Sequence, residues 1–180
     1  LIFRVELFFG LFFFFLILHL VSTGMLAFPL IYHRKKKLNQ SVKSLSVIIA
    51  ARNEARNLSR LIASIASQNH SNFEVIIAKD RSEDDSQKTL EDLQKEHDFL
   101  RVISIQNLPE QWTGKKYALK RAIETAKNDF LVFVDADCWP KTDKWLERLS
   151  DMADDSTDIV LGFSPYERRK GFLNQFIQWE

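Results

Sequence analysis

Two aspartates, Asp135 and Asp137, stand one residue apart directly after an apolar run of the chain. The run, residues 130–134, reads FLVFV and is typical of a buried strand. If the extended geometry continues past the run, both carboxylates project to the same side. Converging carboxylates repel each other unless a cation or a proton joins them. The pair is therefore a candidate Mg²⁺ or Mn²⁺ site, since these ions bind one or two carboxylates together with water and phosphate oxygens.

Further polar side chains follow two earlier apolar runs. They are Arg52, Asn53 and Glu54 after residues 45–51, and Asp80 after residues 73–78. In parallel sheets ligands bind beyond the carboxyl ends of the strands, so these positions are candidates for a binding site. The same residue types also cap helices and form turns, and both roles stay open at this point.

Lys115 and Lys116 follow Gly114 at the expected start of a helix. The free backbone N–H groups of a helix start, together with a cationic side chain, can bind a phosphate. A solvated helix face would explain the two lysines equally well. Cys138 is the one cysteine of the chain, which excludes an intramolecular disulfide and a cysteine-rich zinc site.

The elements that must position these residues alternate between strands and helices. Strands are expected at residues 45–51, 73–78, 100–105, 130–134 and 159–163. The helices between them are indicated by apolar residues at helical spacing: these are Leu58, Leu61, Ile62 and Ile65; Leu90 and Leu93; Ala118, Leu119, Ala122 and Ile123; and Trp145, Leu146 and Leu149. Ser82 and Asp85 resemble a capping pair that opens the second helix. The pattern predicts an α/β fold with a mainly parallel sheet and helices on both faces.

An uncharged apolar segment covers residues 7–32 and is long enough to cross a membrane as one helix. It lacks the polar face of a core helix, and its basic residues follow it, whereas those of a signal peptide come first. We divide this part into a flank at residues 1–6, the transmembrane helix, and a basic tether at residues 33–43. The basic run at residues 34–37 predicts a single-pass membrane protein whose following domain lies on the cytoplasmic side.

The near-neutral formal net charge of +1 conceals this concentration of basic residues in the tether. The part after the tether is mildly acidic. A nucleic-acid surface needs lysine and arginine clustered on the folded face, so we expect no nucleic-acid partner.

Four ordered motifs resemble those of family 2 glycosyltransferases, which are inverting enzymes with the GT-A nucleotide-diphospho-sugar transferase fold. They read SVIIAARNEARNL at residues 46–58, VIIAKDRSEDDS at 75–86, WTGKKYALKRAI at 112–123 and FLVFVDADCWP at 130–140. The WTGK stretch is most similar to membrane-bound members that act on lipid or isoprenoid-type acceptors. The resemblance implies a GT-A-like domain at residues 44–180, a UDP-sugar as donor, and a lipid or glycan as acceptor.

The resemblance also implies a role for each matching position on the nucleoside side of the site. Ala51, Arg52 and Glu54 would line the nucleotide pocket, and Asp80 would contact the base. Lys79 stands where the family usually has a first aspartate, and Arg81 stands where glycine is common. These two departures bear on the choice of nucleotide. The change of the usual proline to Ala50 should be tolerated easily.

On the diphosphate side the resemblance implies that Asp135 faces the ribose and that Asp137 holds Mg²⁺ or Mn²⁺. Lys115 would lie near the donor. The family's general base, a carboxylate, lies well beyond the Asp-x-Asp motif, and no base motif is recognisable here after Asp137. Residues 171–180 carry apolar side chains that need a partner surface. We therefore expect an N-terminal fragment whose general base lies beyond residue 180 and whose catalytic residues are unknown.

Three other classes share parts of this pattern. A phosphohydrolase of the haloacid dehalogenase type also has Asp-x-Asp after a strand, but near the start of its domain, whereas three strand-helix units come first here. A nucleotidyltransferase would have a glycine-rich segment after the first strand, and residues 50–57 contain no glycine. A non-catalytic, membrane-anchored module that binds a nucleotide-sugar remains an alternative.

Overall fold

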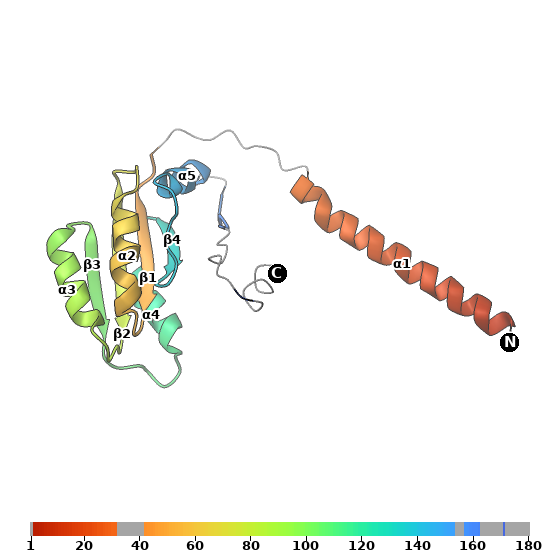
Figure 1. Ribbon diagram of the computed structural model, residues 1–180, viewed down its shortest axis with the longest axis horizontal. Helices are drawn as coiled ribbons and strands as arrows, with labels where there is room; N and C mark the ends of the chain where they lie inside the picture. Colours follow the sequence, from red (N-terminus) through yellow and green to blue (C-terminus); the bar gives the residue numbers. More distant parts are fainter. Residues whose placement is uncertain (1, 32–41, 154–156, 163–170, 172–180) are drawn as a thin grey trace. The chain divides into compact units, whose positions relative to one another are not determined.

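The computed structural model describes residues 2–31, 42–153, 157–162 and 171, with the side chains of residues 2–7, 27 and 29–31 left out. The chain divides into two compact units, Leu1–Lys37 and Leu38–Glu180 (Figure 1). Each unit is described by itself. Most of the predicted tether, from residue 33 to 41, and the end of the chain at residues 172–180 lie outside the described residues.

The first unit contains one helix, α1 (Ile2–Ile31). Its stretch Phe8–Leu26 has a mean hydropathy of 2.1, and none of it is buried within the protein. By length and composition this helix can cross a membrane. It begins before the predicted segment of residues 7–32, and Tyr32 lies outside the described residues.

Strands and helices alternate through the second unit as the sequence predicts. In chain order the elements are β1 (Leu45–Ala51), α2 (Ala55–Ala66), β2 (Phe73–Asp80), α3 (Ser86–Glu96), β3 (Leu100–Ile105), α4 (Gly114–Ile123), β4 (Phe130–Asp135) and α5 (Trp145–Met152). The strand bounds at 45–51 and 100–105 agree with the prediction. β2 runs two residues further than predicted and β4 one.

The four strands form one parallel sheet in the order β3-β2-β1-β4. Leu45 at the start of β1 pairs with Phe73 of β2 on one side and with Phe130 of β4 on the other. The chain therefore moves outward from β1 through β2 to β3, and then returns across the sheet to β4. This return is made through α4, which contacts β1, β2 and β3.

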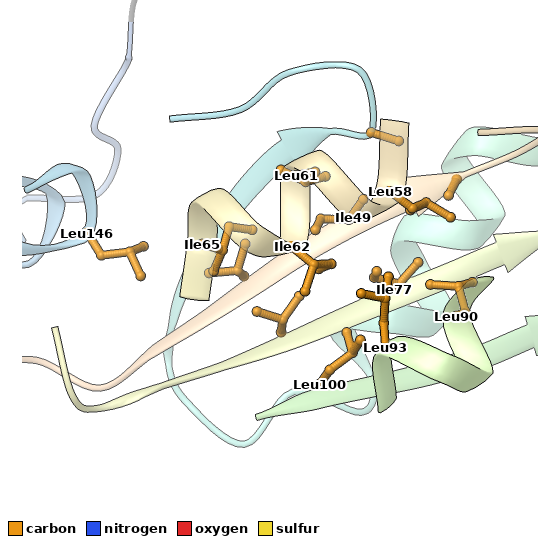
Figure 2. Close-up of a cluster of buried hydrophobic side chains, with 14 of the residues drawn as sticks. Ile49, Leu58, Leu61, Ile62, Ile65, Ile77, Leu90, Leu93, Leu100 and Leu146 are labelled. Atoms are coloured by element: carbon orange, nitrogen blue, oxygen red, sulfur yellow. The ribbon is translucent and has the colours of Figure 1, made fainter. Parts of the chain in front are cut away.

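Each face of the sheet is covered because successive strand residues point to opposite sides. Val47, Ile49, Val75 and Ile77 face the larger cluster, which α2 and α3 complete; Figure 2 shows Ile49 and Ile77 together with labelled side chains of these two helices. Alternate residues face the smaller cluster with α4. The buried residues of this smaller cluster are Ile48, Ile76, Ala78 and Ile105 from the strands and Ala118 and Ala122 from α4. Helices on both faces explain why β1 and β2 read as continuous apolar runs.

β4 is less buried than its sequence suggests. Its residues are half-buried or exposed, and the ring of Phe133 is 54% exposed. The reason is its place at one edge of the sheet within the described residues, where β1 is its strand neighbour on one side. Apolar content predicted the strand correctly but could not reveal how many neighbours cover it.

Two predicted local features are wrong. Ser82 and Asp85 do not form a capping pair, because α3 begins at Ser86 and Asp85 precedes it without a side-chain capping bond. The strand expected at residues 159–163 is not formed in its described part. Ile159 and Leu161 are there 77% and 91% exposed, so no sheet neighbour covers them.

Two buried polar residues stabilise the amino end of the sheet, where its parallel strands begin. Glu74 of β2 accepts hydrogen bonds from Ser46 (2.7 Å), the backbone N–H of Lys127 (2.6 Å) and Arg101 (3.2 Å). Burial alone would raise the pKa of Glu74, but these hydrogen bonds and the charge of Arg101 outweigh it and hold the pKa below its ordinary value.

Gln68, just after α2, is the second of these residues and holds the start of α5. Its Oε1 accepts from the backbone N–H groups of Trp145 (2.9 Å) and Leu146 (3.0 Å), and its Nε2 donates to the carbonyls of Ser64 and Thr142. One buried amide thus satisfies donors at the start of α5 that the helix itself leaves free. It also places α5 at the amino end of the sheet, because α2 runs back from the carboxyl end.

Candidate functional site

The carboxyl edge of the sheet is the expected location of the site. The strand order changes direction at β1, whose neighbours are β2 on one side and β4 on the other. Parallel α/β sheets bind ligands at this type of switch point. Here it lies between Ala51 and Asp135, the last residues of β1 and β4.

The last residue of β1 and the segment after it supply three of the predicted residues. The side chain of Ala51 is buried in the larger core cluster, so Ala51 can line a site through its backbone alone. Arg52 is exposed and forms no hydrogen bond or ion pair with the described residues. Glu54 is half-buried and accepts a hydrogen bond from Asn57 at 2.6 Å.

This segment is held by the loop that follows β2. Asn53 adopts a positive φ of 58°, a conformation that asparagine tolerates better than most residues. Its backbone N–H donates to Ser82 Oγ (3.1 Å), and its Oδ1 accepts from the backbone N–H of Glu83 (2.8 Å). The two loops therefore form one connected rim at the carboxyl edge. The sequence indicates only that Asn53 can cap a helix, and its spacing does not report the link to Ser82.

Asp84, in the loop after β2, and Ser86, the first residue of α3, extend the same rim by capping α2. Asp84 Oδ2 accepts from the backbone N–H of Ala55 (3.0 Å), and Ser86 Oγ accepts from that of Glu54 (3.2 Å). Burial would raise the pKa of Asp84, but hydrogen bonds from Ser86 and from the N–H groups of Ala55 and Ser86 hold it below its ordinary value. Asp84 therefore stays ionised beside the positive end of the α2 dipole.

A shallow pocket of about 550 Å³ opens along this rim. Its lining residues are Asn53, Glu54, Arg56, Asn57, Glu83 and Asp84. Of the residues that the resemblance assigned to the site, Glu54 lines this pocket. The others lie outside its lining: Ala51, Arg52, Asp80, Lys115, Asp135 and Asp137. The pocket carries three carboxylates against one guanidinium, which disfavours a bare phosphate.

Asp80 ends β2 and is 4% exposed. Both of its oxygens are bound by the neighbouring Arg81: Nε lies 2.7 Å from Oδ1 and Nη2 lies 3.1 Å from Oδ2. This hydrogen bonding raises the pKa of Arg81, so the guanidinium stays charged. Arg81 has a φ of 46°, in the left-handed region where glycine is the usual residue.

Gly114, the first residue of α4, lies directly against this ion pair. A Cβ on Gly114 would overlap Asp80 Oδ2 and would come within 2.8 Å of Arg81 Nη2. The glycine of the WTGK stretch therefore permits the close approach of α4 to the end of β2. Sequence reasoning used this glycine only to place a helix start.

Lys115 and Asp135 form the second ion pair of the site, with Nζ 2.7 Å from Oδ1. Their side chains are 63% and 60% exposed, so a ligand can reach both. The structure thus joins two residues that the sequence proposed separately, one from the start of α4 and one from the end of β4. Lys116, the other lysine of the helix start, is exposed and outside this pair.

Asp137 does not continue the strand. β4 ends at Asp135, and the backbone N–H of Cys138 bonds to the carbonyl of Asp135 at 3.0 Å, which closes a turn. The expectation that both carboxylates project to one side rested on an extended backbone, and that premise is wrong here. Asp137 is exposed, and its contact within the described residues is with the Cys138 thiol at 3.6 Å.

The donor set at this turn fits a hard divalent cation that keeps most of its shell for other ligands. In the described part of the chain, no group of three or more histidine, cysteine, aspartate or glutamate side chains is arranged so that it could hold a metal ion by itself. One or two exposed carboxylates are what Mg²⁺ or Mn²⁺ uses when substrate phosphates supply further oxygens. Asp137 is the more accessible of the two, because Asp135 already binds Lys115.

Comparisons with known proteins identify relatives of this chain. The model of the family "Glycosyl transferase family 2" matches residues 46–179. Among curated proteins, the chain is 29% identical over 118 residues to the "Putative glycosyltransferase EpsH" of Bacillus subtilis, covering 66% of this chain and 33% of that protein. It is 31% identical over 93 residues to a Campylobacter jejuni "GalNAc(5)-diNAcBac-PP-undecaprenol beta-1,3-glucosyltransferase", covering 52% of this chain and 29% of that one.

Solved structures share the fold. The mannosyltransferase PcManGT from Pyrobaculum calidifontis, in complex with GDP-Man and Mn²⁺, superposes with a TM-score of 0.59 at 21% identity. That match covers 77% of this chain and 44% of the other. S. aureus TarS 1–349 in complex with UDP-GlcNAc gives a TM-score of 0.52 at 25% identity and covers 59% and 30% of the two chains. The chain therefore spans less than half the length of each relative named here.

Proposed function

Because this chain belongs to glycosyl transferase family 2, we propose that it forms part of a membrane-anchored enzyme that transfers a sugar from a nucleotide-diphosphate sugar to a lipid or glycan acceptor. The observation that carries the proposal is the joining of Lys115 to Asp135 at 2.7 Å. This pair lies at the switch point of the sheet, where a GT-A-like fold would receive its donor.

The order of the strands orients the donor. β2 and β4 are separated by β1, and neighbouring strands lie about 4.8 Å apart, so their carboxyl ends are about 10 Å apart. A nucleoside diphosphate can bridge this distance. We place its nucleobase at Asp80 and Arg81, where β2 ends, and its diphosphate at Lys115 and Asp137.

At the β4 end, Asp137 would hold Mg²⁺ or Mn²⁺, and Asp135 would orient the ribose. Lys115 would hold the side chain of Asp135 in place. A divalent cation there supplies charge neutralisation for the diphosphate leaving group. Lys115 would add a second positive charge at the same end. Its ion pair with Asp135 is exposed, so a diphosphate can compete with Asp135 for the ammonium group.

Transfer then requires a nucleophile and a base. The acceptor hydroxyl would attack the anomeric carbon from the face opposite the nucleotide, which inverts that centre, and a carboxylate would accept the hydroxyl proton. We place this general base outside the described residues, since the family resemblance implies a carboxylate well beyond the Asp-x-Asp motif.

The nature of donor and acceptor is proposed from relatives. A UDP-sugar donor is supported by the complex of TarS 1–349 with UDP-GlcNAc. A lipid-linked acceptor is supported by the undecaprenol-linked substrate in the name of the Campylobacter relative.

Anchoring to a membrane is supported by α1, whose apolar stretch Phe8–Leu26 can span the hydrocarbon core. The four basic residues at 34–37 follow this helix, whereas Arg4 is the only basic residue before its apolar stretch. By the positive-inside rule this asymmetry supports a cytoplasmic location for the second unit.

The test is calorimetric titration of the chain in detergent micelles with UDP, with and without Mn²⁺. We expect Mn²⁺-dependent binding that Asp137→Ala weakens at least about tenfold, as for the loss of a charged metal ligand. Asp129→Ala is the matched control, because Asp129 is an exposed aspartate at the opposite end of β4. Absence of binding by UDP and GDP to the folded wild-type chain would contradict the proposed donor site.

A further inference from the structure

The ion pair at the end of β2 changes what the nucleoside would meet. An unpaired aspartate presents acceptor oxygens, which suit the N–H of a base. Here Asp80 is 4% exposed and both of its oxygens already accept from Arg81. The Arg81 side chain, in contrast, is 30% exposed.

The geometry fixes which part of Arg81 remains available. The guanidinium uses Nε and Nη2 toward Asp80, so the N–H bonds of Nη1 and the second N–H of Nη2 stay available to a ligand. A fork–fork ion pair of this kind holds the guanidinium in one plane. Gly114 closes the side of the pair that faces α4, where not even a methyl group would fit.

The backbone keeps Arg81 in this position as well. Its N–H donates to the carbonyl of Ile105 at the end of β3 (3.1 Å), and its φ is 46°. The arginine thus stands at the junction of β2, β3 and the start of α4, two strands away from the turn that carries Asp137. This distance separates it from the diphosphate end of the donor.

We propose that Arg81, held in place by Asp80, is the side chain that contacts the nucleobase and that it recognises a carbonyl oxygen of that base. This inference rests on the proposed function, because it assumes that a nucleotide binds at this edge. Asp80 is then a positioning residue, and the specificity of the site is for bases that carry an oxo group, such as uracil or guanine, over adenine.

The proposal predicts an energetic coupling between Arg81 and one oxygen atom of the ligand. Replacing a carbonyl oxygen of uracil by sulfur gives a weaker hydrogen-bond acceptor at the same ring position. The probes are UDP, 4-thio-UDP and 2-thio-UDP, titrated calorimetrically with Mn²⁺ into the chain in detergent micelles; GDP and 6-thio-GDP take their place if GDP is the nucleotide that binds. ADP provides the base without an oxo group.

We expect one thio analogue to bind the wild type about tenfold more weakly than its parent, as for a hydrogen bond to a charged donor, and ADP to bind more weakly still. In Arg81→Gly, which suits the positive φ, parent and thio analogue should bind within about twofold of each other. Arg148→Gln is the matched control and should retain the tenfold difference, because Arg148 is exposed on α5 at the amino end of the sheet.

Two results would overturn the proposal. One is equal binding of UDP and both thio analogues to the wild type, a measurement that needs no variant to fold. The other is a thio effect of the same size in the wild type and in Arg81→Gly. The failure of UDP and GDP to bind at all would instead contradict the proposed donor site, and is therefore distinguishable from both. Asp80→Asn separates positioning from contact: it should reduce the thio effect while Arg81 is still present.

Discussion

Gly114 lies so close to Asp80 that a methyl group on its Cα would overlap the carboxylate. The first turn of α4 and the end of β2 are therefore in contact at a point where one participant has no side chain. The neighbouring residue, Lys115, reaches Asp135 on β4. Two consecutive residues of one helix thus contact both ends of the proposed nucleotide site.

The first prediction concerns this contact. Gly114→Ala should lower the free energy of unfolding by about 1–3 kcal/mol, because the added methyl group displaces α4 or the ion pair. The same displacement should weaken UDP binding by moving Lys115. Urea denaturation and calorimetric titration measure the two effects. Gly162→Ala is the control, since a Cβ there meets nothing within 4 Å. Equal stability of the two variants would contradict the close packing described here.

The second prediction separates function from stability at Lys115. Lys115→Met should weaken UDP binding about tenfold, the loss expected when a charged contact to phosphate is removed. It should change the free energy of unfolding by less than about 1 kcal/mol, because an exposed ion pair contributes little. Lys127→Met, a lysine exposed before β4, should alter neither quantity. A large loss of stability in Lys115→Met would show that the pair is structural.

The third prediction is a pH dependence that originates at Glu74. Its pKa is lower in the folded protein than its ordinary value, so the folded state favours the ionised form. The resulting stability is fully present above the unfolded pKa of about 4.5 and is lost as the pH falls through the lower, folded value. Glu74→Gln should destabilise the protein by about 1–3 kcal/mol at neutral pH and should flatten the decline below pH 5.

Denaturation curves between pH 3 and 7 test this difference. Glu96→Gln, at the exposed end of α3, serves as the control for the loss of one carboxylate. Parallel pH profiles for the wild type and Glu74→Gln would show that Glu74 is not the source.

The fourth prediction concerns Gln68, which joins α2 to α5 through its buried amide. Gln68→Ala removes the acceptor for two backbone N–H groups and should cost about 2–3 kcal/mol of stability. Gln68→Glu keeps the acceptor oxygen but replaces the Nε2 donor by a carboxylate oxygen. This oxygen would repel the carbonyls of Ser64 and Thr142, so the variant should not restore stability. Gln87→Ala, on the exposed face of α3, is the matched control. Rescue by Gln68→Glu would contradict the donor role of Nε2.

Much of the fold could be predicted because each strand carries its own local signal. The apolar run at β1 gave correct bounds, since its residues are buried on both faces of a parallel sheet. The bounds of β3 were also correct, although Arg101 and Ser104 interrupt its apolar residues. The misplaced strand at residues 159–163 has the same composition, but the sheet offers no neighbour to its described residues. An apolar composition indicates that a segment tends to be buried, but the rest of the chain determines whether a neighbouring element buries it.

The site was predictable in its location and only partly in its contacts. Strand ends identified Asp80 and Asp135, because topology alone brings them to one edge. The partners of these carboxylates were not predictable, since Lys115 reaches Asp135 through a tertiary contact between α4 and β4. Arg81 was noticed as an unusual residue, but its bidentate contact with Asp80 depends on a positive φ that sequence spacing does not report.

The central position of β1 has a consequence for how the protein folds. Leu45 of β1 pairs with Phe73, roughly 30 residues later, and with Phe130, roughly 85 residues later, and the longer loop costs about 1 kcal/mol more chain entropy to close. During synthesis the β1–β2 unit is complete long before β4 leaves the ribosome. The half of the site that carries the Arg81 ion pair can therefore assemble first, and the half that carries Asp135 and Asp137 follows once β4 is available.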